Sequence, residues 1–352
     1  MKKVGILTFC NANNYGAVLQ AFALQEYIST FCDVELINLN FNSNIHQNSN
    51  AKIHESIILK LIKKMKRRRF KKFRTMYLKI SHNKICGDFE TNKIASDYDI
   101  FIVGSDQVWN TDITNHTKAF FLDFVKDKKK ISYAASFGRK QITDLELLWV
   151  NEYLNSFSAI SLREKYSAIQ LQNILHTTVQ CVCDPVFLLN NNQWEKKLKL
   201  KKFNRKYVLI YYMEISPAIK SILKIIKEKY QLSIYAIRGG NETISGVHHI
   251  SVAGPVDFLN LIRNAEMIVT NSFHAISFSI IFKKKLLAIG HSKWNLRIQN
   301  LLQLFNCESK LIDSEYIIQD NLSDFEIDGN VKYMDFEQYI EKSKIFLTTA
   351  ID

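Results

Sequence analysis

Small groups of polar and glycine residues stand directly after short apolar stretches of this sequence. They contain Asn14, Tyr15 and Gly16; Ser105, Asp106 and Gln107, with Trp109 close behind; Ser136; Arg163; Asp184; and Asn271, Ser272 and His274. Carboxylates and imidazoles can move protons, while guanidinium groups and the amides at a helix start can hold an anion. Six such groups are more than helix capping requires, so we interpret them as parts of a functional site.

Each of these residues also has a structural interpretation, and the residues alone do not decide between the two. Asn14 and Gly16 could simply form a capping turn at the start of a helix. Arg163 could form a surface or inter-helix salt bridge. His274 could be a buried structural histidine, although a histidine at a helix N-terminus can also donate a hydrogen bond to an anion.

Several common cofactor motifs are missing. Neither GxGxxG nor GxxxxGK[ST] occurs, which removes the usual support for a dinucleotide site or a P-loop. No HExxH motif occurs, and no CxxC pair suggests zinc. We therefore expect neither a metal nor another cofactor. Reduced, mostly buried thiols are expected at Cys10, Cys32, Cys86, Cys181, Cys183 and Cys307.

Short apolar strands alternate with helical segments along the chain, which is the pattern of a parallel α/β sheet. The predicted strands are 4–9, 34–38, 99–103, 131–135, 159–162, 179–182, 207–213, 232–237, 267–270 and 286–289. The predicted helices are 17–28, 143–156, 164–175, 217–230, 255–265, 272–282, 297–305 and 335–348.

A polar, charged stretch at residues 190–206 is interpreted as the linker between two such series. We therefore expect two doubly wound, Rossmann-like domains, 1–195 and 196–352, with the last helix packing back on the first domain. Ligands of such sheets bind beyond the carboxyl ends of the strands. The site is therefore expected in a cleft that the two domains face.

The positive charge of the chain is concentrated in one segment. The formal net charge is +13, and residues 60–79 hold 11 basic residues and no acidic one. Apolar residues recur there at roughly helical spacing, which predicts a basic amphipathic helical insertion at about 52–80. It could be a solvated helix packed on the protein, a contact with an anionic membrane surface through 57–79, or a nucleic-acid-binding element. No nucleic-acid-binding signature accompanies it, so we expect no nucleic acid partner.

The composition is that of an ordinary globular protein, with 47% apolar and 23% charged residues. No apolar run approaches the ~18 residues of a membrane span. The apolar stretch after the initial MKK is too short for a signal-peptide core. We expect a cytoplasmic protein, and a membrane-binding basic helix would make it peripheral at the inner face of the membrane.

In this order, the polar turns resemble those of the polysaccharide pyruvyl transferase family. The resemblance runs from GILTFCNANNYGAVLQAFALQ through DYDIFIVGSDQVWN, ISYAASFG, SLREKYS and VCDPVFLL to VTNSFHAISFSIIFKKKLLAIG. It covers most of the chain, and the first segment and GSDQVWN are its most specific parts. It implies a two-domain fold similar to that of the glycosyltransferases of type B.

The resemblance also implies an activity. Family members take phosphoenolpyruvate as donor and place a pyruvyl ketal on two hydroxyls of a sugar, in a surface polysaccharide or its lipid-linked precursor. The donor is expected in the second domain and the interdomain cleft, where an arginine and a histidine contact it. His274 matches that histidine, whereas Ser272 stands where many members have the arginine of an Arg-x-His motif. Arg163, Arg238 or Arg297 would then supply the charge.

Roles for individual residues follow from their chemistry and from the resemblance. We expect His274 to contact the phosphate and act as an acid, with Asp106 as the base and Asp184 as the second candidate. The expected donor-binding residues are Arg163, Ser272, Asn271, Arg297 and Arg238. The expected acceptor-binding residues are Asn14, Tyr15, Gly16, Ser105, Gln107, Trp109 and Ser136.

Two other functions stay open on the sequence. A glycosyltransferase that uses a nucleotide sugar would have the same architecture, because a fold does not fix a donor. A non-catalytic scaffold in polysaccharide assembly would also fit, because the arginine of the Arg-x-His motif is absent.

Overall fold

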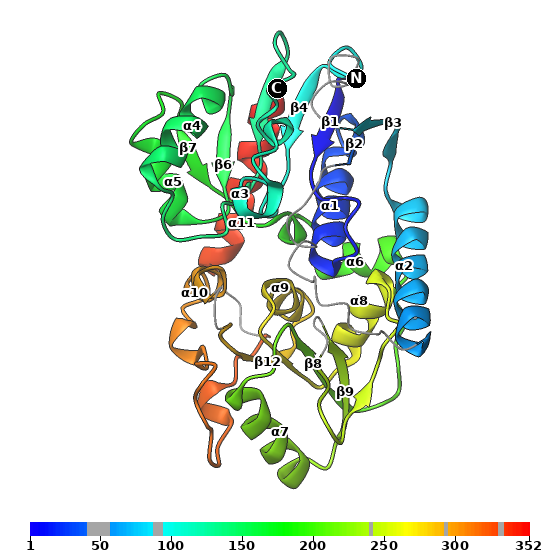
Figure 1. The fold of residues 1–352 in the computed structure, drawn as a ribbon. Helices are drawn as coiled ribbons and strands as arrows, with labels where there is room; N and C mark the ends of the chain where they lie inside the picture. Colours follow the sequence, from blue (N-terminus) through cyan, green and yellow to red (C-terminus); the bar gives the residue numbers. More distant parts are fainter. Residues whose placement is uncertain (41–56, 87–93, 239–241, 292–294, 330–333) are drawn as a thin grey trace. The chain divides into compact units, whose positions relative to one another are not determined.

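The computed structural model describes residues 1–40, 57–86, 94–238, 242–291, 295–329 and 334–352 (Figure 1). The chain divides into two compact units. Unit 1 comprises Met1–Ile57, Lys71–Leu189 and Glu337–Asp352, and unit 2 comprises Ile58–Phe70 and Asn190–Phe336. No helix in the described ranges combines the length and the apolar character that a membrane crossing needs.

Unit 1 is built on parallel strands in the order β3-β2-β1-β4-β5, and isolated bridges join a second small sheet, β6-β7, to this series beside β5. The strands are β1 (Lys3–Leu7), β2 (Asp33–Asn40), β3 (Ile80–Cys86), β4 (Ile100–Val103), β5 (Lys129–Ser132), β6 (Ile160–Leu162) and β7 (Val179–Cys181). The order reverses between β1 and β4. The carboxyl ends of these two strands therefore form the switch point at which doubly wound sheets bind their ligands.

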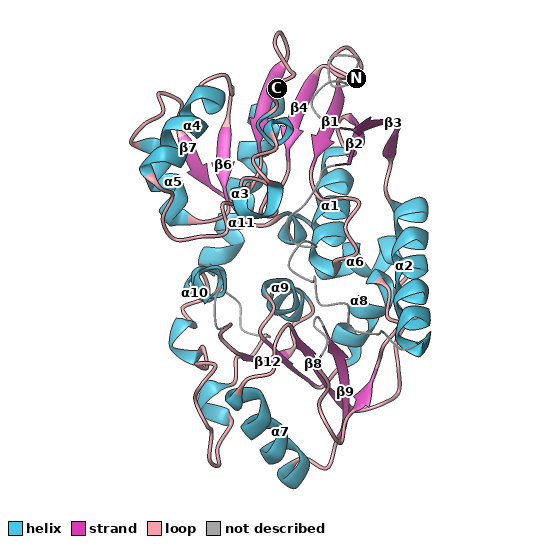
Figure 2. Ribbon diagram, viewed as in Figure 1, coloured by secondary structure: helices cyan, strands magenta, loops and turns pink. Residues whose placement is uncertain are grey.

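Helices cover both faces of the unit 1 sheet (Figure 2). On one face lies α1 (Tyr15–Ile28), which is buried along most of its length and whose Leu24 packs beside Ile6 and Gly104. The other face carries an apolar cluster in which Trp109 packs with α4 (Asp144–Leu154). The remaining helices are α3 (Thr111–Thr114), η3 (Lys118–Phe121), α5 (Lys165–Gln172), η4 (Pro185–Leu188) and α11 (Met334–Ile351), most of which groups with unit 1.

Unit 2 repeats the same strand order. Its parallel sheet runs β10-β9-β8-β11-β12, so the order reverses between β8 and β11. The strands are β8 (Tyr207–Tyr212), β9 (Ser233–Arg238), β10 (His248–His249), β11 (Met267–Thr270) and β12 (Lys285–Ala288). β8 and β11 are fully buried, which explains their continuous apolar character, since a central parallel strand is covered on both faces.

Helices also cover both faces of the unit 2 sheet. α7 (Pro217–Lys229) packs against Val208 and Ile210 of β8, while Tyr211, which points the other way, meets Phe258 of α8 (Pro255–Asn264). α7 starts at the hydroxyl cap of Ser216 followed by a proline, a common helix start. The remaining helices are α6 (Asn191–Leu198), α9 (Phe273–Ile281), α10 (Asn295–Gln303), η5 (Glu308–Lys310) and η6 (Ser323–Phe325).

The predicted basic helix is α2 (Ile57–Tyr77). Its Phe70 and Phe73 are buried, and Phe73 contacts Phe22 of α1 edge to face. The division into units falls within α2, because Ile58–Phe70 groups with unit 2 and the residues from Lys71 onward group with unit 1.

The predicted linker 190–206 is partly wrong. Residues Asn191–Leu198 form α6, which Asn190 caps and whose Trp194 is fully buried against Phe278. The unit boundary accordingly falls at Leu189–Asn190. β3 was also missed, because the strand Ile80–Cys86 alternates polar residues at the edge of the sheet and lacks the apolar run expected of a buried strand.

Candidate functional site

The switch point of unit 1 is closed by side chains from three segments. Thr8, which follows β1, donates its hydroxyl to the carbonyl of Ser105 at 2.7 Å and accepts from Gln20 Nε2 of α1 at 2.8 Å. Gly104 is closely packed, because an added Cβ would lie 3.2 Å from side-chain atoms of Leu24 and Thr8. The GSDQVWN segment is therefore held tightly against β1 and α1.

A buried ionic cluster lies behind this segment. Arg163 donates from Nη1 to Asp184 Oδ2 at 2.7 Å and from Nε to Glu164 Oε1 at 3.3 Å. Ser105 donates to the same oxygen of Asp184 at 3.1 Å, and Ser136 donates to Glu164 at 2.7 Å. Burial alone would lower the pKa of Arg163, but the charges of the two carboxylates and of nearby Asp106 raise it.

The cluster assigns structural partners to four predicted site residues. The side chains of Arg163 and Asp184 are at most 4% exposed, and Ser105 and Ser136 have no exposed surface. Arg163 belongs to unit 1. Within unit 2 it therefore does not replace the arginine of the Arg-x-His motif, where this chain has Ser272. A buried guanidinium between two carboxylates needs such pairing, because an isolated buried charge is very costly.

Asp106 differs from its buried neighbours Ser105 and Gln107 in its exposure and in its backbone conformation. Its carboxylate is partly exposed and accepts a hydrogen bond from the backbone amide of Gln107 at 2.9 Å. Its backbone φ is 82°, a left-handed conformation that a residue with a side chain adopts only under constraint. The constraint is visible, because the segment pairs with Ala135 beside β5. Backbone strain of this kind is concentrated at functional sites.

Trp109 lies in the core of unit 1, which differs from the predicted contact with an acceptor. It is fully buried, stacks on Phe121 at 5.6 Å and donates from Nε1 to the carbonyl of Phe120 at 2.9 Å. A side chain with no exposed surface cannot reach a sugar. Gln107 is 8% exposed and accepts from Asn110 Nδ2, so it too mainly shapes the loop.

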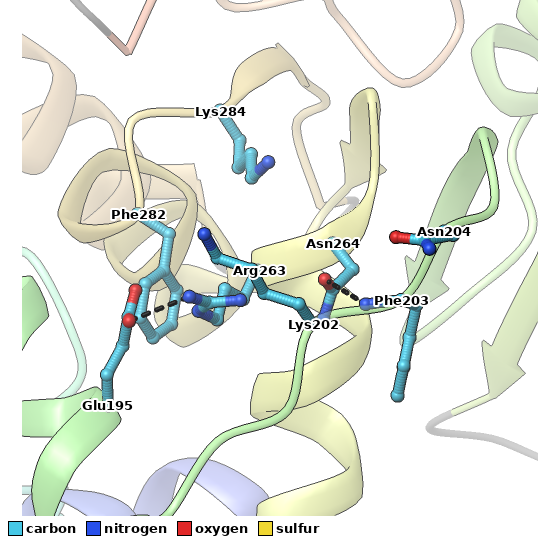
Figure 3. Close-up of a pocket in the computed structure, with 8 residues that line it drawn as sticks. All are labelled: Glu195, Lys202, Phe203, Asn204, Arg263, Asn264, Phe282 and Lys284. Atoms are coloured by element: carbon cyan, nitrogen blue, oxygen red, sulfur yellow. Dashed lines mark hydrogen bonds and ion pairs between the residues drawn. The ribbon is translucent and has the colours of Figure 1, made fainter.

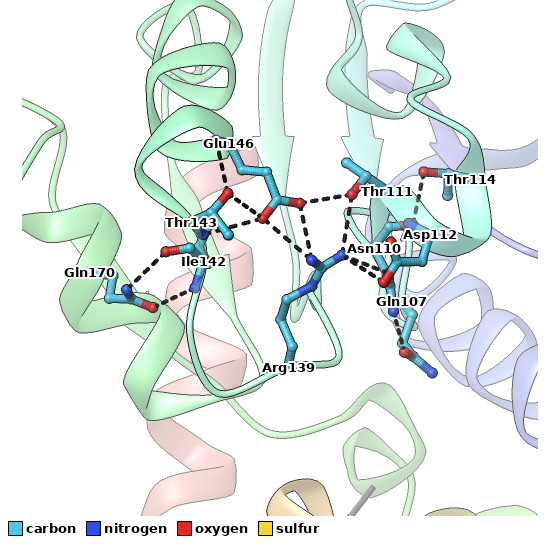
Figure 4. A network of polar contacts seen from close by, with 10 residues as sticks. All are labelled: Gln107, Asn110, Thr111, Asp112, Thr114, Arg139, Ile142, Thr143, Glu146 and Gln170. Carbon is cyan, nitrogen blue, oxygen red and sulfur yellow. Dashed lines mark hydrogen bonds and ion pairs between the residues drawn. The ribbon is translucent and has the colours of Figure 1, made fainter. Parts of the chain in front are cut away.

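An arginine that is not among the predicted site residues clamps this loop (Figure 4). Arg139 donates from Nη2 to Asn110 Oδ1 at 3.1 Å and pairs with Asp112 at 3.2 Å and Glu146 of α4 at 3.2 Å. Glu146 also closes the capping box of α4 with Thr143. Arg139 therefore joins the end of the GSDQVWN segment to α4, a role that no local sequence pattern reveals.

The predicted acceptor group after β1 is partly a helix cap. Asn14 is exposed and accepts from Ala17 N at 3.2 Å, which caps α1, whereas Tyr15 and Gly16 are buried in its first turn. Arg74 of α2 holds the same loop by donating to the carbonyl of Ala12 and to Asn13 Oδ1, both at 3.2 Å.

The switch point of unit 2 is tied together by Asn271. This side chain accepts from the amide of Met213 at 2.8 Å and donates to the carbonyl of Glu214 at 3.1 Å. Met213 and Glu214 follow β8, and Asn271 follows β11. Asn271 is 2% exposed, so it joins two strand ends and leaves little surface for direct contact with a donor.

Ser272 and His274 stand at the start of α9, directly after β11. Ser272 is partly exposed and makes no side-chain cap bond, and His274 lies in the first turn with 9% of its surface exposed. The backbone N–H groups of a first helical turn have no partner within the helix, and the helix dipole favours negative charge there. The turn that carries Ser272 and His274 therefore has an electrostatic character that suits an anion.

A second histidine, which is not among the predicted site residues, follows the neighbouring strand β12. His291 follows β12 and places its Nδ1 3.4 Å from Glu214 Oε1, and its side chain is 11% exposed. Because β11 lies between β8 and β12, this contact spans the end of β11, where α9 begins. The only sequence signal was position: both residues follow strand ends.

Two cations lie near the end of β9. Arg238 closes that strand, and burial together with the charge of Arg238 lowers the pKa of Lys66, which comes from α2. Arg297, the other predicted donor arginine of unit 2, is partly buried in the first turn of α10. The carboxyl edge of unit 2 thus collects histidines and cations. In the described ranges, no three His, Cys, Asp or Glu side chains are placed to hold a metal ion.

A pocket of about 310 Å³ lies at the other edge of the unit 2 sheet (Figure 3). It is lined by Glu195, Lys202, Phe203, Asn204, Arg263, Asn264, Phe282 and Lys284. Asn264 ends α8 three residues before β11, and Lys284 directly precedes β12, so this is the amino edge of the strands. Arg263 is already paired with Glu195 at 2.7 Å, and ligands of doubly wound sheets bind at the opposite edge.

The Glu146 clamp predicts a specific loss of stability in acid. Burial opposes the charge of this carboxyl, but hydrogen bonds from Thr111 and Thr143 and the charge of Arg139 outweigh it and lower the pKa below 4.5. The stabilisation is present above 4.5 and disappears as the pH falls through the folded-state pKa. In urea unfolding, Glu146→Gln should have a lower free energy of unfolding than wild type at pH 7, and the two values should converge in acid. Glu152→Gln, exposed on the same helix, should follow wild type at every pH.

Comparisons with known proteins agree with this architecture. The UDP-GlcNAc 2-epimerase from Methanocaldococcus jannaschii is 14% identical over 100% of both chains, with a TM-score of 0.58. The UDP-N-acetylglucosamine 2-epimerase from Rickettsia bellii is 10% identical over 100% of this chain and 96% of that chain, with a TM-score of 0.51. These likenesses show the fold, which is that of the glycosyltransferase B type with two Rossmann-like domains.

In sequence, no curated protein matches the chain. A family model described as polysaccharide pyruvyl transferase matches residues 14–293. That range begins at Asn14, directly before α1, contains the switch point of unit 2 and ends just after His291, and it confirms the resemblance seen in the sequence. The chain therefore belongs to the polysaccharide pyruvyl transferase family and is a transferase.

Proposed function

We propose that this enzyme transfers a pyruvyl group from phosphoenolpyruvate to two hydroxyls of a sugar, in a surface polysaccharide or its lipid-linked precursor, and forms a pyruvyl ketal. The observation that carries the proposal is the carboxyl edge of unit 2, where His274 in the first turn of α9 and the Glu214–His291 pair follow neighbouring strands of one sheet. This edge offers an anion site and two imidazoles, which are the groups that the reaction needs.

The reaction has a simple atom balance. A proton adds to the methylene carbon of phosphoenolpyruvate and makes a methyl group, which leaves an oxocarbenium-like centre at the neighbouring carbon. Two sugar hydroxyls each form a bond from oxygen to that carbon, and the bond from the carbon to the phosphate oxygen breaks. Of the two protons that the hydroxyls lose, one replaces the proton delivered to the methylene carbon and the other leaves with the phosphate.

The donor carries about three negative charges near neutral pH, so it needs positive partners. We assign its phosphate to the first turn of α9, with Ser272 and His274, because amides and an imidazole at a helix start suit an anion. Ser272 brings no charge in place of the family's arginine. We assign the carboxylate of the donor to Arg238 and Lys66. These two cations lie close together, because burial and the charge of Arg238 lower the pKa of Lys66. Arg297 is the alternative to them.

The two histidines are assigned different proton transfers. His274 delivers the proton to the methylene carbon and contacts the departing phosphate. His291 takes the proton of an attacking hydroxyl at Nε2, because its Nδ1 faces Glu214 and the carboxylate fixes the ring orientation. Asp106 of unit 1, the base predicted from the sequence, remains a second candidate for this step.

His274→Ala should lower turnover by at least a hundredfold. Removal of one preorganised donor from an anion site costs roughly 10²–10³ in kcat in comparable enzymes. The measurement is phosphate release from phosphoenolpyruvate in the presence of an acceptor extract. His82→Ala, exposed on β3, is the matched control and should behave like wild type. Turnover of His274→Ala within threefold of wild type would remove this residue from the mechanism.

Glu214→Gln should separate catalysis from donor binding. Loss of the carboxylate releases the ring of His291, so kcat should fall by roughly tenfold or more, while KM for phosphoenolpyruvate changes little. Glu228→Gln, exposed on α7, is the control. A rise in KM with unchanged kcat would instead make Glu214 and His291 part of donor binding.

Donor identity can be tested without knowing the acceptor. Phosphoenolpyruvate at 100 times its Kd should stabilise the folded protein by about 2.7 kcal/mol and raise Tm, whereas UDP-N-acetylglucosamine should leave Tm unchanged. The reverse pattern would replace the proposal with a nucleotide-sugar glycosyltransferase. Phosphate release that needs both phosphoenolpyruvate and an acceptor would exclude a non-catalytic scaffold.

A further inference from the structure

The apolar residues of α2 belong to two separate faces. One face is buried: Phe70 and Phe73 have at most 2% of their surface exposed, and Tyr77 contacts Phe22 of α1. The other is open to solvent and contains Ile57, Ile58, Leu61, Met65 and Met76, which are 43–85% exposed. Packing on the protein therefore accounts for only part of the amphipathic pattern in this helix.

Helical geometry places the exposed apolar residues in one row. Ile58, Leu61 and Met65 are spaced by three and four residues, so they share a side of the helix, and Arg68 and Lys72 continue the same row. Lys60, Lys64, Arg67 and Lys71 repeat the spacing in a neighbouring row, and all are exposed. The outer face of α2 thus joins an apolar row to rows of cations, and α2 contains no acidic residue.

This combination selects one kind of partner. A helix with cations on its polar side and large apolar side chains beside them is suited to the boundary between lipid headgroups and acyl chains. Large exposed apolar groups mark interaction sites, and a phosphate backbone alone would make no use of them. The apolar row therefore favours lipid over nucleic acid.

We propose that the outer face of α2 docks the enzyme on an anionic membrane surface. Ile57, Ile58, Leu61 and Met65 enter the headgroup region, and the lysines and arginines of the neighbouring rows contact anionic headgroups. Arg69 faces Asp257 at 4.0 Å and Arg74 donates to the loop after β1, so we assign both to contacts within the protein.

The experiment is co-sedimentation of the full chain with vesicles. Binding should be strong to phosphatidylcholine vesicles that contain phosphatidylserine, weak to pure phosphatidylcholine vesicles, and reduced by salt, because salt screens exposed charges. Ile58→Ser with Leu61→Ser, and separately Lys64→Glu with Arg68→Glu, should each weaken binding by roughly tenfold or more. The readout needs no turnover, so it stands or falls independently of the proposed reaction.

Each double variant has a matched control elsewhere in the chain. Leu145→Ser with Leu148→Ser changes two exposed leucines of α4 at the same spacing as Ile58 and Leu61. Lys220→Glu with Lys224→Glu changes two exposed lysines of α7 at the same spacing as Lys64 and Arg68. Both controls should bind like wild type, and circular dichroism checks that all variants are folded.

Two outcomes would overturn the proposal. Equal binding to neutral and anionic vesicles, or loss of binding in the control variants, would mean that α2 is not the docking surface. Binding to an RNA homopolymer that depends on Lys64 and Arg68 but not on Ile58 and Leu61, without binding to anionic vesicles, would assign the cations to nucleic acid instead.

Discussion

The arrangement of unit 2 depends on one amide side chain. The strand order of the sheet reverses between β8 and β11. Asn271, which follows β11, connects the two strand ends there by hydrogen bonds to the amide of Met213 and the carbonyl of Glu214. It thereby fixes Glu214, whose carboxylate reaches His291 across the end of β11. Any displacement of the loop after β8 would move the carboxylate and leave the imidazole without its orientation. The orientation of His291 therefore depends on hydrogen bonds between Asn271 and the backbone after β8.

Unit 1 reaches a similar rigidity with charges. Arg163 is surrounded by the carboxylates of Asp184 and Glu164, and the hydroxyls of Ser105 and Ser136 complete the cluster. Buried ion pairs contribute little net stability, but removing one partner leaves a buried charge unpaired, which is strongly destabilising. The cluster therefore acts mainly as a constraint on the loops above it. These loops carry Asp106, the predicted carboxylate of this edge that remains partly exposed.

Much of this architecture could be predicted from the sequence, because buried parallel strands are continuous apolar runs and β11 was located to the residue. Side-chain environments were less accessible. Trp109 belongs to a polar motif, yet its ring is buried in the core of unit 1, because packing between residues far apart in the chain determines burial. The pair of Glu214 and His291 joins residues far apart in the chain, and no local pattern marks such a contact. Alternating polar residues concealed β3 at the sheet edge, and the charges of residues 190–206 concealed α6.

The left-handed backbone at Asp106 has an evolutionary consequence. A side chain in this conformation costs about 1 kcal/mol or more, and glycine would adopt it without that penalty. Substitution of Asp106 by glycine would therefore relieve the backbone strain of the loop but remove the carboxylate. Homologous chains selected only for robustness should drift to glycine at this position, so an aspartate that persists there would mark lineages in which the carboxylate is still under selection for activity.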